Sequence, residues 1–119
     1  MTPVRQWDII RFKIRPQDID LHPGVVLSGE EWCASDQLGN LNILACSKRP
    51  PVAELKHHQV LLNGADGLDF RTTVDCRFFH IIPKTEVHEV IGRVATERRR
   101  SIGRKINEVL RLQLSPNSP

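Results

Sequence analysis

The sequence predicts a mainly β fold of the α+β class, in which a small SH3-like barrel or a strongly curled antiparallel sheet is followed by a C-terminal helix. Four or five short β-favouring runs are separated by short polar segments, which is typical of such sheets. Glycine and proline mark the ends of these runs, where they favour turns. After residue 95 the hydrophobic period changes from that of a strand to that of a helix. The length of 119 residues allows a single domain, covering residues 1–119.

Two strands are predicted near the N-terminus. Residues 7–14 alternate apolar and basic side chains, which predicts a half-buried strand. Residues 24–28 form a short apolar run that predicts a buried strand. Pro23 and Gly24 fix where this strand begins. His22, directly before the proline, is therefore expected at the tip of a loop.

The middle of the chain predicts a helical turn and three further strands. Residues 30–33 are compatible with a short helical turn. The β-favouring runs at 41–47, 59–62 and 72–82 predict strands, and the last of these is the longest and ends at Pro83.

The C-terminal part of the chain has the period of an amphipathic helix. Thr96 is the expected N-cap, because it precedes an acidic residue and the apolar pattern. One apolar stripe is formed by residues at i, i+4, i+7 and i+8: Ile102, Ile106, Val109 and Leu110. The charged residues fall largely on the opposite face.

The net charge of +3 is concentrated in the last quarter of the sequence, which is rich in arginine and lysine. Such a face suits a phosphate backbone or an acidic partner protein, but it is equally the ordinary solvated side of a helix. No apolar run approaches the roughly 20 residues that cross a bilayer. The N-terminus lacks the apolar core of a secretory signal. A cytoplasmic protein that does not enter the membrane is therefore expected.

Cysteine and histidine usage excludes several classes of site. Cys33, Cys46 and Cys76 are odd in number, widely spaced and without a CxxC pair, which predicts reduced and mostly buried thiols. His57 and His58 are adjacent, so on a strand they point to opposite faces and cannot jointly hold a metal. No phosphate-binding loop, dinucleotide motif or zinc spacing is present in the sequence. No metal and no cofactor is expected.

Five segments carry a resemblance through their order and spacing: Trp7–Ile10, His22–Ser28, Ile43–Lys48, Gly67–Leu68 with Thr72–Cys76, and Ile91–Val94. Together they resemble the MazF/PemK (Kid-like) toxins. The first is similar to that family's Gly-Asp-Ile-Val opening strand and the second to its Arg-Pro strand. The third is similar to a strand that ends in an active-site threonine or serine. The fourth is similar to Gly-Leu followed by Ser-x-Val-x-Cys, and the fifth to the Ile-Gly-x-Leu before the last helix. The resemblance covers about residues 7–112.

The resemblance implies a growth-inhibiting toxin of a type II toxin–antitoxin pair, with a fold of the MazF/PemK/CcdB type. Such a toxin is an mRNA interferase, that is, an endoribonuclease that cuts single-stranded RNA without a metal. The 2′-hydroxyl attacks the adjacent phosphorus and leaves a 2′,3′-cyclic phosphate and a 5′-hydroxyl, so the protein must supply a base, an acid and a cation. The implied partners are single-stranded RNA, a cognate antitoxin and a second copy of the chain in a homodimer.

Two candidate catalytic residues come from the second and third segments. His22 stands where the family has a catalytic arginine, and a histidine there can act as acid or base because its pKa lies near neutrality. The alternative is a hydrogen-bonded loop histidine without a catalytic role. Ser47 falls on the threonine or serine position and is expected to donate a hydrogen bond to the scissile phosphate. A register slip of one residue would place Cys46 there instead.

Two more candidates flank Cys76, where the family instead has an aspartate–glutamine pair after its cysteine. Asp75 and Arg77 share one face of the predicted strand, because residues i and i+2 do. Arg77 is the expected phosphate stabiliser, since its fork matches two phosphate oxygens. Asp75 is expected to orient or charge the site. The alternative for this pair is an exposed salt bridge on the sheet surface.

Three basic residues beside these positions are expected to bind RNA: Lys48, Arg49 and Arg71. A second function stays open, because the family's arginine and its aspartate–glutamine pair are both replaced. In that alternative the chain is a catalytically silent barrel that binds a protein or a nucleic acid.

Overall fold

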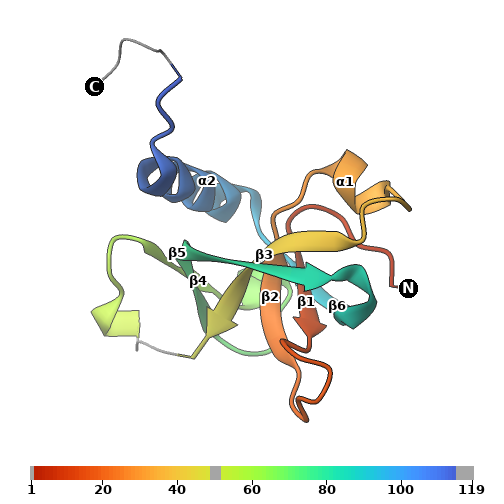
Figure 1. Cartoon of the computed structure of the whole chain (residues 1–119). Coiled ribbons are helices and arrows are strands. Elements are labelled where there is room, and N and C mark those ends of the chain that lie inside the picture. The colour runs from red at the N-terminus through yellow and green to blue at the C-terminus, as the bar shows by residue number, and fades with distance from the viewer. Residues whose placement is uncertain (1, 49–51, 115–119) are drawn as a thin grey trace.

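The computed structural model describes residues 2–48 and 52–114. Within these ranges the strands form one antiparallel sheet of six strands in the order β4-β5-β3-β2-β1-β6, with β4 and β6 at its two edges (Figure 1). The mainly β prediction is confirmed, and the sheet is an open one rather than a closed barrel. The elements are β1 (Asp8–Phe12), β2 (His22–Val26), α1 (Glu30–Ala34), β3 (Asn40–Ser47), β4 (Gln59–Leu62), β5 (Thr72–Pro83), β6 (Val87–Arg93) and α2 (Thr96–Leu110).

The central strands bury both of their faces, which explains their near-continuous apolar runs. In β1, Ile9 and Ile10 belong to two different hydrophobic clusters, and in β2 so do Val25 and Val26. Successive side chains of a strand point to opposite faces, so the two clusters fill opposite sides of the sheet. Helix α2 covers the first cluster through Ile102, which is completely buried.

The predicted elements before α2 are all present. β1 ends at Phe12, two residues before the predicted strand end, and Ile14 beyond it is 50% exposed. The short helical turn is α1, β3 begins one residue before the predicted run, and β4 has the predicted bounds. β5 extends through Pro83 rather than ending before it.

Two strand expectations are corrected by the structure. His22 is not at a loop tip but is the first residue of β2, where it pairs with Phe12. β6 is a sixth strand that the sequence pattern does not predict. Its register against β1 shifts between Ile9 and Ile10 and again between Arg11 and Phe12. Such irregularities break the two-residue alternation by which a strand is recognised.

Helix α2 is capped by a residue from another part of the chain. Its N-cap is Ala95 and not Thr96, so the predicted cap is displaced by one residue. Alanine has no side-chain acceptor for the N–H groups of the first turn, and the Asp66 carboxylate instead accepts the backbone N–H of Ala95 itself at 2.8 Å. Asp66 is buried, and it also accepts the N–H of Asn63 at 2.9 Å and a hydrogen bond from the Arg98 guanidinium. This carboxylate therefore complements the positive end of the helix and fixes its start on the sheet.

The apolar stripe of α2 contacts the sheet along only part of its length. Ile102 is buried and Ile106 packs against the first cluster, as predicted. Val109 and Leu110 are instead 39% and 49% exposed, so the last turn projects beyond the sheet (Figure 1). No helix within the described ranges combines the length and the apolarity needed to span a membrane.

A close approach at Gly92 in β6 leads to a stability prediction. A Cβ there would lie 2.5 Å from the carbonyl oxygen of Asp66 and 3.1 Å from Cδ2 of Leu68. Because the oxygen belongs to the turn that caps α2, it cannot give way freely. We expect Gly92→Ala to lower the free energy of unfolding by about 1–3 kcal/mol, measured by denaturant titration.

The matched control for this substitution is Gly103→Ala in α2, where a Cβ would meet nothing within 4 Å. Alanine is favoured over glycine inside a helix, so this variant should gain about 0.5–1 kcal/mol. Equal effects of the two substitutions would contradict the steric argument.

Candidate functional site

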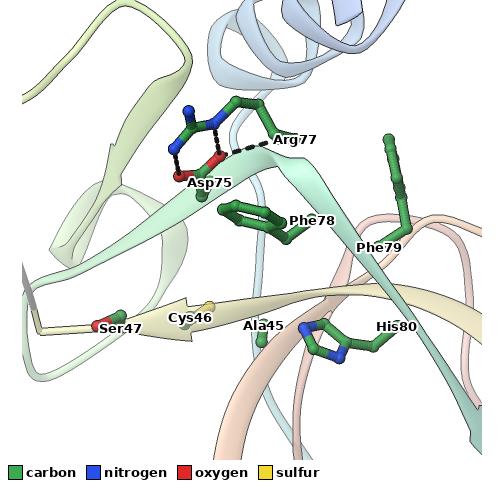
Figure 2. Close-up of a pocket in the computed structure, with 8 residues that line it drawn as sticks. All are labelled: Ala45, Cys46, Ser47, Asp75, Arg77, Phe78, Phe79 and His80. Carbon is green, nitrogen blue, oxygen red and sulfur yellow. Dashed lines mark hydrogen bonds and ion pairs between the residues drawn. The ribbon is translucent and has the colours of Figure 1, made fainter. Parts of the chain in front are cut away.

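A bulge in β5 shapes a pocket on the sheet (Figure 2). Leu44 of β3 faces Phe79 of β5, whereas Cys46 of β3 faces Val74. The four β5 residues between 74 and 79 therefore lie opposite a single β3 residue. Extra residues in one strand bend it and re-aim its side chains, and such bulges often accompany functional sites. Here the bend separates the part of β5 that pairs with β4 from the part that continues along β3.

The pocket has a volume of about 560 Å³ and is open to solvent. It combines polar side chains with two aromatic rings, Phe78 and Phe79, which are 58% and 38% exposed. Exposed aromatic rings next to basic groups suit the stacking of unpaired nucleic-acid bases. The residues that line the pocket are Ala45, Cys46, Ser47, Asp75, Arg77, Phe78, Phe79 and His80.

Asp75 and Arg77 form the polar centre of the pocket, and the expectation that they share a face is confirmed. The Arg77 guanidinium donates from Nε to Asp75 Oδ1 at 3.1 Å and from Nη2 to Oδ2 at 3.0 Å. The backbone N–H of Arg77 also donates to Oδ1 at 3.0 Å. Burial alone would raise the pKa of Asp75, but the hydrogen bonds from Arg77, together with the electrostatic influence of the nearby His58 and Arg77 side chains, lower it below its usual range. Asp75 is therefore a stable carboxylate at neutral pH.

Ser47 ends β3 at the mouth of the pocket, where it pairs with Thr73. Its carbonyl oxygen accepts the hydroxyls of Thr72 and Thr73, both at 3.0 Å, which fixes the end of the strand. The neighbouring thiol of Cys46 has its pKa raised to about 12 by burial, so it stays protonated at physiological pH. Because a thiol is a weaker donor than a hydroxyl, Ser47 is the better hydrogen-bond donor of the two.

His22 lies at the same end of the sheet but is not among the residues that line the pocket. It begins β2, two residues before Gly24, which pairs with Ala45 of the pocket. Its ring packs against Phe12, with ring centroids 6.3 Å apart. The structure therefore brings Ser47 together with Asp75 and Arg77, and places His22 on the adjacent strand.

The predicted RNA-binding residues lie around this end of β3 and β5. Lys48 directly follows Ser47 and is exposed, and Arg71 is an exposed residue directly before β5. The pairing of Ser47 with Thr73 places both cations at the same end of the two strands. Arg49 lies outside the described residues.

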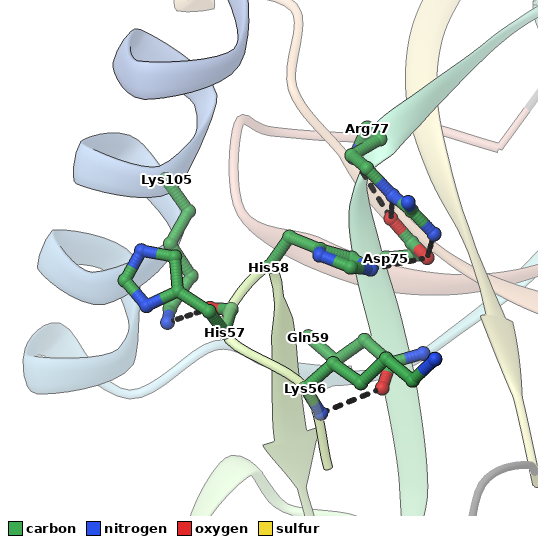
Figure 3. Close-up of polar contacts among 7 residues, drawn as sticks. All are labelled: Lys56, His57, His58, Gln59, Asp75, Arg77 and Lys105. Atoms are coloured by element: carbon green, nitrogen blue, oxygen red, sulfur yellow. Dashed lines mark hydrogen bonds and ion pairs between the residues drawn. The ribbon is translucent and has the colours of Figure 1, made fainter.

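Sequence analysis did not identify two histidines near the pocket. His80 is one of the residues that line it. His58 directs its Nε2 at Asp75, 3.5 Å from Oδ2 (Figure 3). The neighbouring His57 points away to Glu108 of α2 at 2.7 Å. The two histidines lie in the turn before β4 and not on a strand, so strand alternation is not the reason that they diverge. The pairing of Gln59 with Asp75 and the hydrogen bond from the Cys76 N–H to the His58 carbonyl bring His58 to the site, and this register is not visible in local sequence.

Part of the basic face of α2 is used within the fold. Arg98 binds Asp66, Arg99 donates to the Val94 carbonyl at 2.6 Å, and Lys105 donates to the His57 carbonyl. Arg100 and Arg104 are exposed. The face available to a partner is thus smaller than the sequence indicates.

All three cysteines are free thiols, and only Cys76 is fully buried. Burial raises the pKa of Cys76 to about 11. Within residues 2–48 and 52–114, no group of three or more histidine, cysteine or acidic side chains is arranged to hold a metal ion.

No model of a protein family matches this sequence, and no curated protein matches it. Solved structures do match. An endoribonuclease from a mycobacterial species, solved in complex with its cognate antitoxin, has a TM-score of 0.75 and 13% identity, over 97% of this chain and 100% of that chain. The Mycobacterium tuberculosis toxin MazF-mt6 has a TM-score of 0.71 and 17% identity, over 89% and 98%.

A third structure, of MazE–MazF from Deinococcus radiodurans, has a TM-score of 0.74 and 12% identity, over 92% of this chain and 97% of that chain. The structural likeness extends over nearly the whole of each chain, although only 12% to 17% of the residues are identical. The curled six-stranded sheet with its C-terminal helix is therefore the fold of the MazF toxins.

Proposed function

We propose that the protein is a toxin-like endoribonuclease that cleaves single-stranded RNA in the cytoplasm without a metal. The observation that carries the proposal is the open pocket whose lining includes Ser47, Asp75 and Arg77, on a chain with the fold of known endoribonucleases. Among the groups that phosphodiester cleavage requires, the pocket offers a cation and a hydrogen-bond donor, and the adjacent strand β2 offers one proton-transfer group.

Each proposed role follows from the chemistry of the side chain. Arg77 binds the scissile phosphate and stabilises the charge that develops on its oxygens. Ser47 donates a hydrogen bond to the same phosphate. His22 transfers a proton as acid or base, and Asp75 orients Arg77. The 2′-hydroxyl of the substrate is the nucleophile, so the products are a 2′,3′-cyclic phosphate and a 5′-hydroxyl.

The deciding experiment incubates the purified protein with a long single-stranded RNA in the presence of a chelator. Cleavage with a 2′,3′-cyclic phosphate at the new 3′ end supports the proposal. A chelator-sensitive reaction contradicts the metal-independent mechanism, and absence of cleavage contradicts the enzymatic function.

A second candidate function is a catalytically silent module that binds RNA or protein. The contact that favours it is the bidentate pairing of Arg77 with Asp75, because the guanidinium that would bind phosphate is already bound to a carboxylate. RNA or partner binding without cleavage would identify this function.

We further propose that an antitoxin covers the same site with an acidic, partly disordered segment. One matched endoribonuclease was solved with its cognate antitoxin, and Lys48, Arg71 and Arg77 give this chain a basic surface for such a segment. We expect a peptide carrying the acidic segment to displace single-stranded RNA in a competition assay. Simultaneous, independent binding of the two would contradict a shared surface.

We also propose that the protein is a homodimer. Outside the pocket, large apolar side chains are exposed on β5 and on the edge strand β6, as is usual for an interface between copies: Ile81 and Val90. We expect light scattering at micromolar concentration to give about twice the chain mass of 13.6 kDa. A monomer over a wide range of concentration would contradict this proposal.

A further inference from the structure

We infer that His58 is a positioning residue that holds the Asp75 carboxylate while Arg77 binds a phosphate of the RNA. The inference rests on the proposed function of the pocket. His58 acts through Asp75 and Arg77, and it need not touch the RNA.

In the free protein the charges of Arg77 and Asp75 neutralise each other, since Nε and Nη2 of Arg77 both bind the Asp75 carboxylate. A phosphate bound to Arg77 brings a second anion beside Asp75. Two anions that share one cation repel each other, and this repulsion is strong where water is partly excluded. Asp75 therefore needs a second partner whenever phosphate is bound.

His58 is placed to be this second partner of Asp75. Its Nε2 lies 3.5 Å from Asp75 Oδ2, which is too long for a good hydrogen bond. This nitrogen is buried and makes no hydrogen bond to any described residue. A buried polar atom without a partner is costly, so it needs an explanation. The His58 nitrogen lacks a hydrogen bond because Asp75, the nearest acceptor, is held by Arg77 in the free protein.

Only side chains have to move for Asp75 to exchange Arg77 for His58. The backbone around His58 is fixed, because its carbonyl accepts the N–H of Cys76 at 2.9 Å and Gln59 pairs with Asp75. The side chains of His58 and Asp75 are only 20% and 21% exposed, whereas that of Arg77 is 46% exposed. Arg77 can therefore turn toward solvent and the RNA, while Asp75 closes on His58. The Nε2–H form of His58 donates, and no covalent bond is made or broken.

The test measures binding of a 2′-O-methyl RNA oligonucleotide, which cannot be cleaved because it lacks the attacking hydroxyl. In His58→Leu, Asp75 has no second partner, so we expect the Kd to rise about tenfold, the scale of one unsatisfied polar group. In His58→Gln an amide N–H can reach Asp75, so the Kd should stay within about twofold of wild type. The matched control is His57→Leu, since the His57 side chain is 74% exposed and bound to Glu108.

A double-mutant cycle separates this role from a merely structural one. Asp75→Asn removes the anion, so His58→Leu should then change the Kd by no more than about twofold. Circular dichroism and thermal unfolding check that each variant is folded. Proton NMR should show the Nε2–H of His58 gaining a hydrogen bond when the oligonucleotide binds.

The outcomes distinguish the inference from the function on which it rests. If the wild type cleaves RNA but His58→Leu binds like the wild type, or His58→Gln binds as weakly as His58→Leu, the role of His58 is wrong and the function stands. An equal effect of His58→Leu with and without Asp75 also overturns it. If the wild type neither binds nor cleaves RNA, the proposed function fails and the inference fails with it.

Discussion

Replacement of His22 by alanine should lower the rate of RNA cleavage by about 100-fold or more, the usual contribution of a positioned acid or base. The fold should survive, because His22 is the first residue of β2 and its ring, which packs against Phe12, is only half-buried. Single-turnover cleavage of a labelled RNA measures the rate, and thermal unfolding monitors the fold.

The control is His88→Ala, which removes an exposed histidine from the edge strand β6. It should cleave at the wild-type rate. If His22→Ala also cleaves at the wild-type rate, the acid or base is another group, and His80 of the pocket is the next candidate.

The second large effect is expected at Arg77. Arg77→Ala should lower cleavage by about 100-fold, the lower range for loss of a preorganised charge donor. It should also weaken RNA binding. Because one phosphate contact is lost, the slope of log K against log salt should fall by about 0.7 for a single strand. Binding titrations at several salt concentrations measure this slope.

Two further variants show which property of Arg77 matters. Arg77→Lys keeps the charge but loses the planar fork, so it should restore the salt slope more than the cleavage rate. Asp75→Asn should lose cleavage while retaining RNA binding, since the phosphate contacts remain. Unchanged cleavage in Asp75→Asn would mean that the Asp75–Arg77 pair is only a salt bridge on the sheet surface.

Local sequence was sufficient for most of the secondary structure. Alternation predicted β1, a short apolar run predicted β2, and β-favouring runs predicted β3, β4 and β5. β6 was missed because its sequence shows no regular alternation, and in the structure its pairing with β1 is correspondingly irregular. The displaced N-cap of α2 has a distant cause. The acceptor of the Ala95 N–H is Asp66, in a turn 29 residues earlier in the chain.

The candidate site divides in the same way. That Asp75 and Arg77 share a face could be predicted, because residues two apart on a strand do. That Ser47 lines the same pocket depends on the register of β3 against β5 and on the bulge of β5, which lies opposite the β3 segment between Leu44 and Cys46. The approach of His58 depends on the register of β4 against β5.

The sequence by itself thus determined the β class, the position of α2 and the Asp75–Arg77 pair, because each follows from a period within one segment. Only the tertiary structure decided that the sheet stays open, that β5 bulges into a pocket and that His58 faces Asp75. The physical reason is that strand register and bulges arise from contacts between segments far apart in the chain. One residue of register shift in β4 would turn its side chains to the opposite face of the sheet and end the pairing of Gln59 with Asp75 that holds His58 at the site.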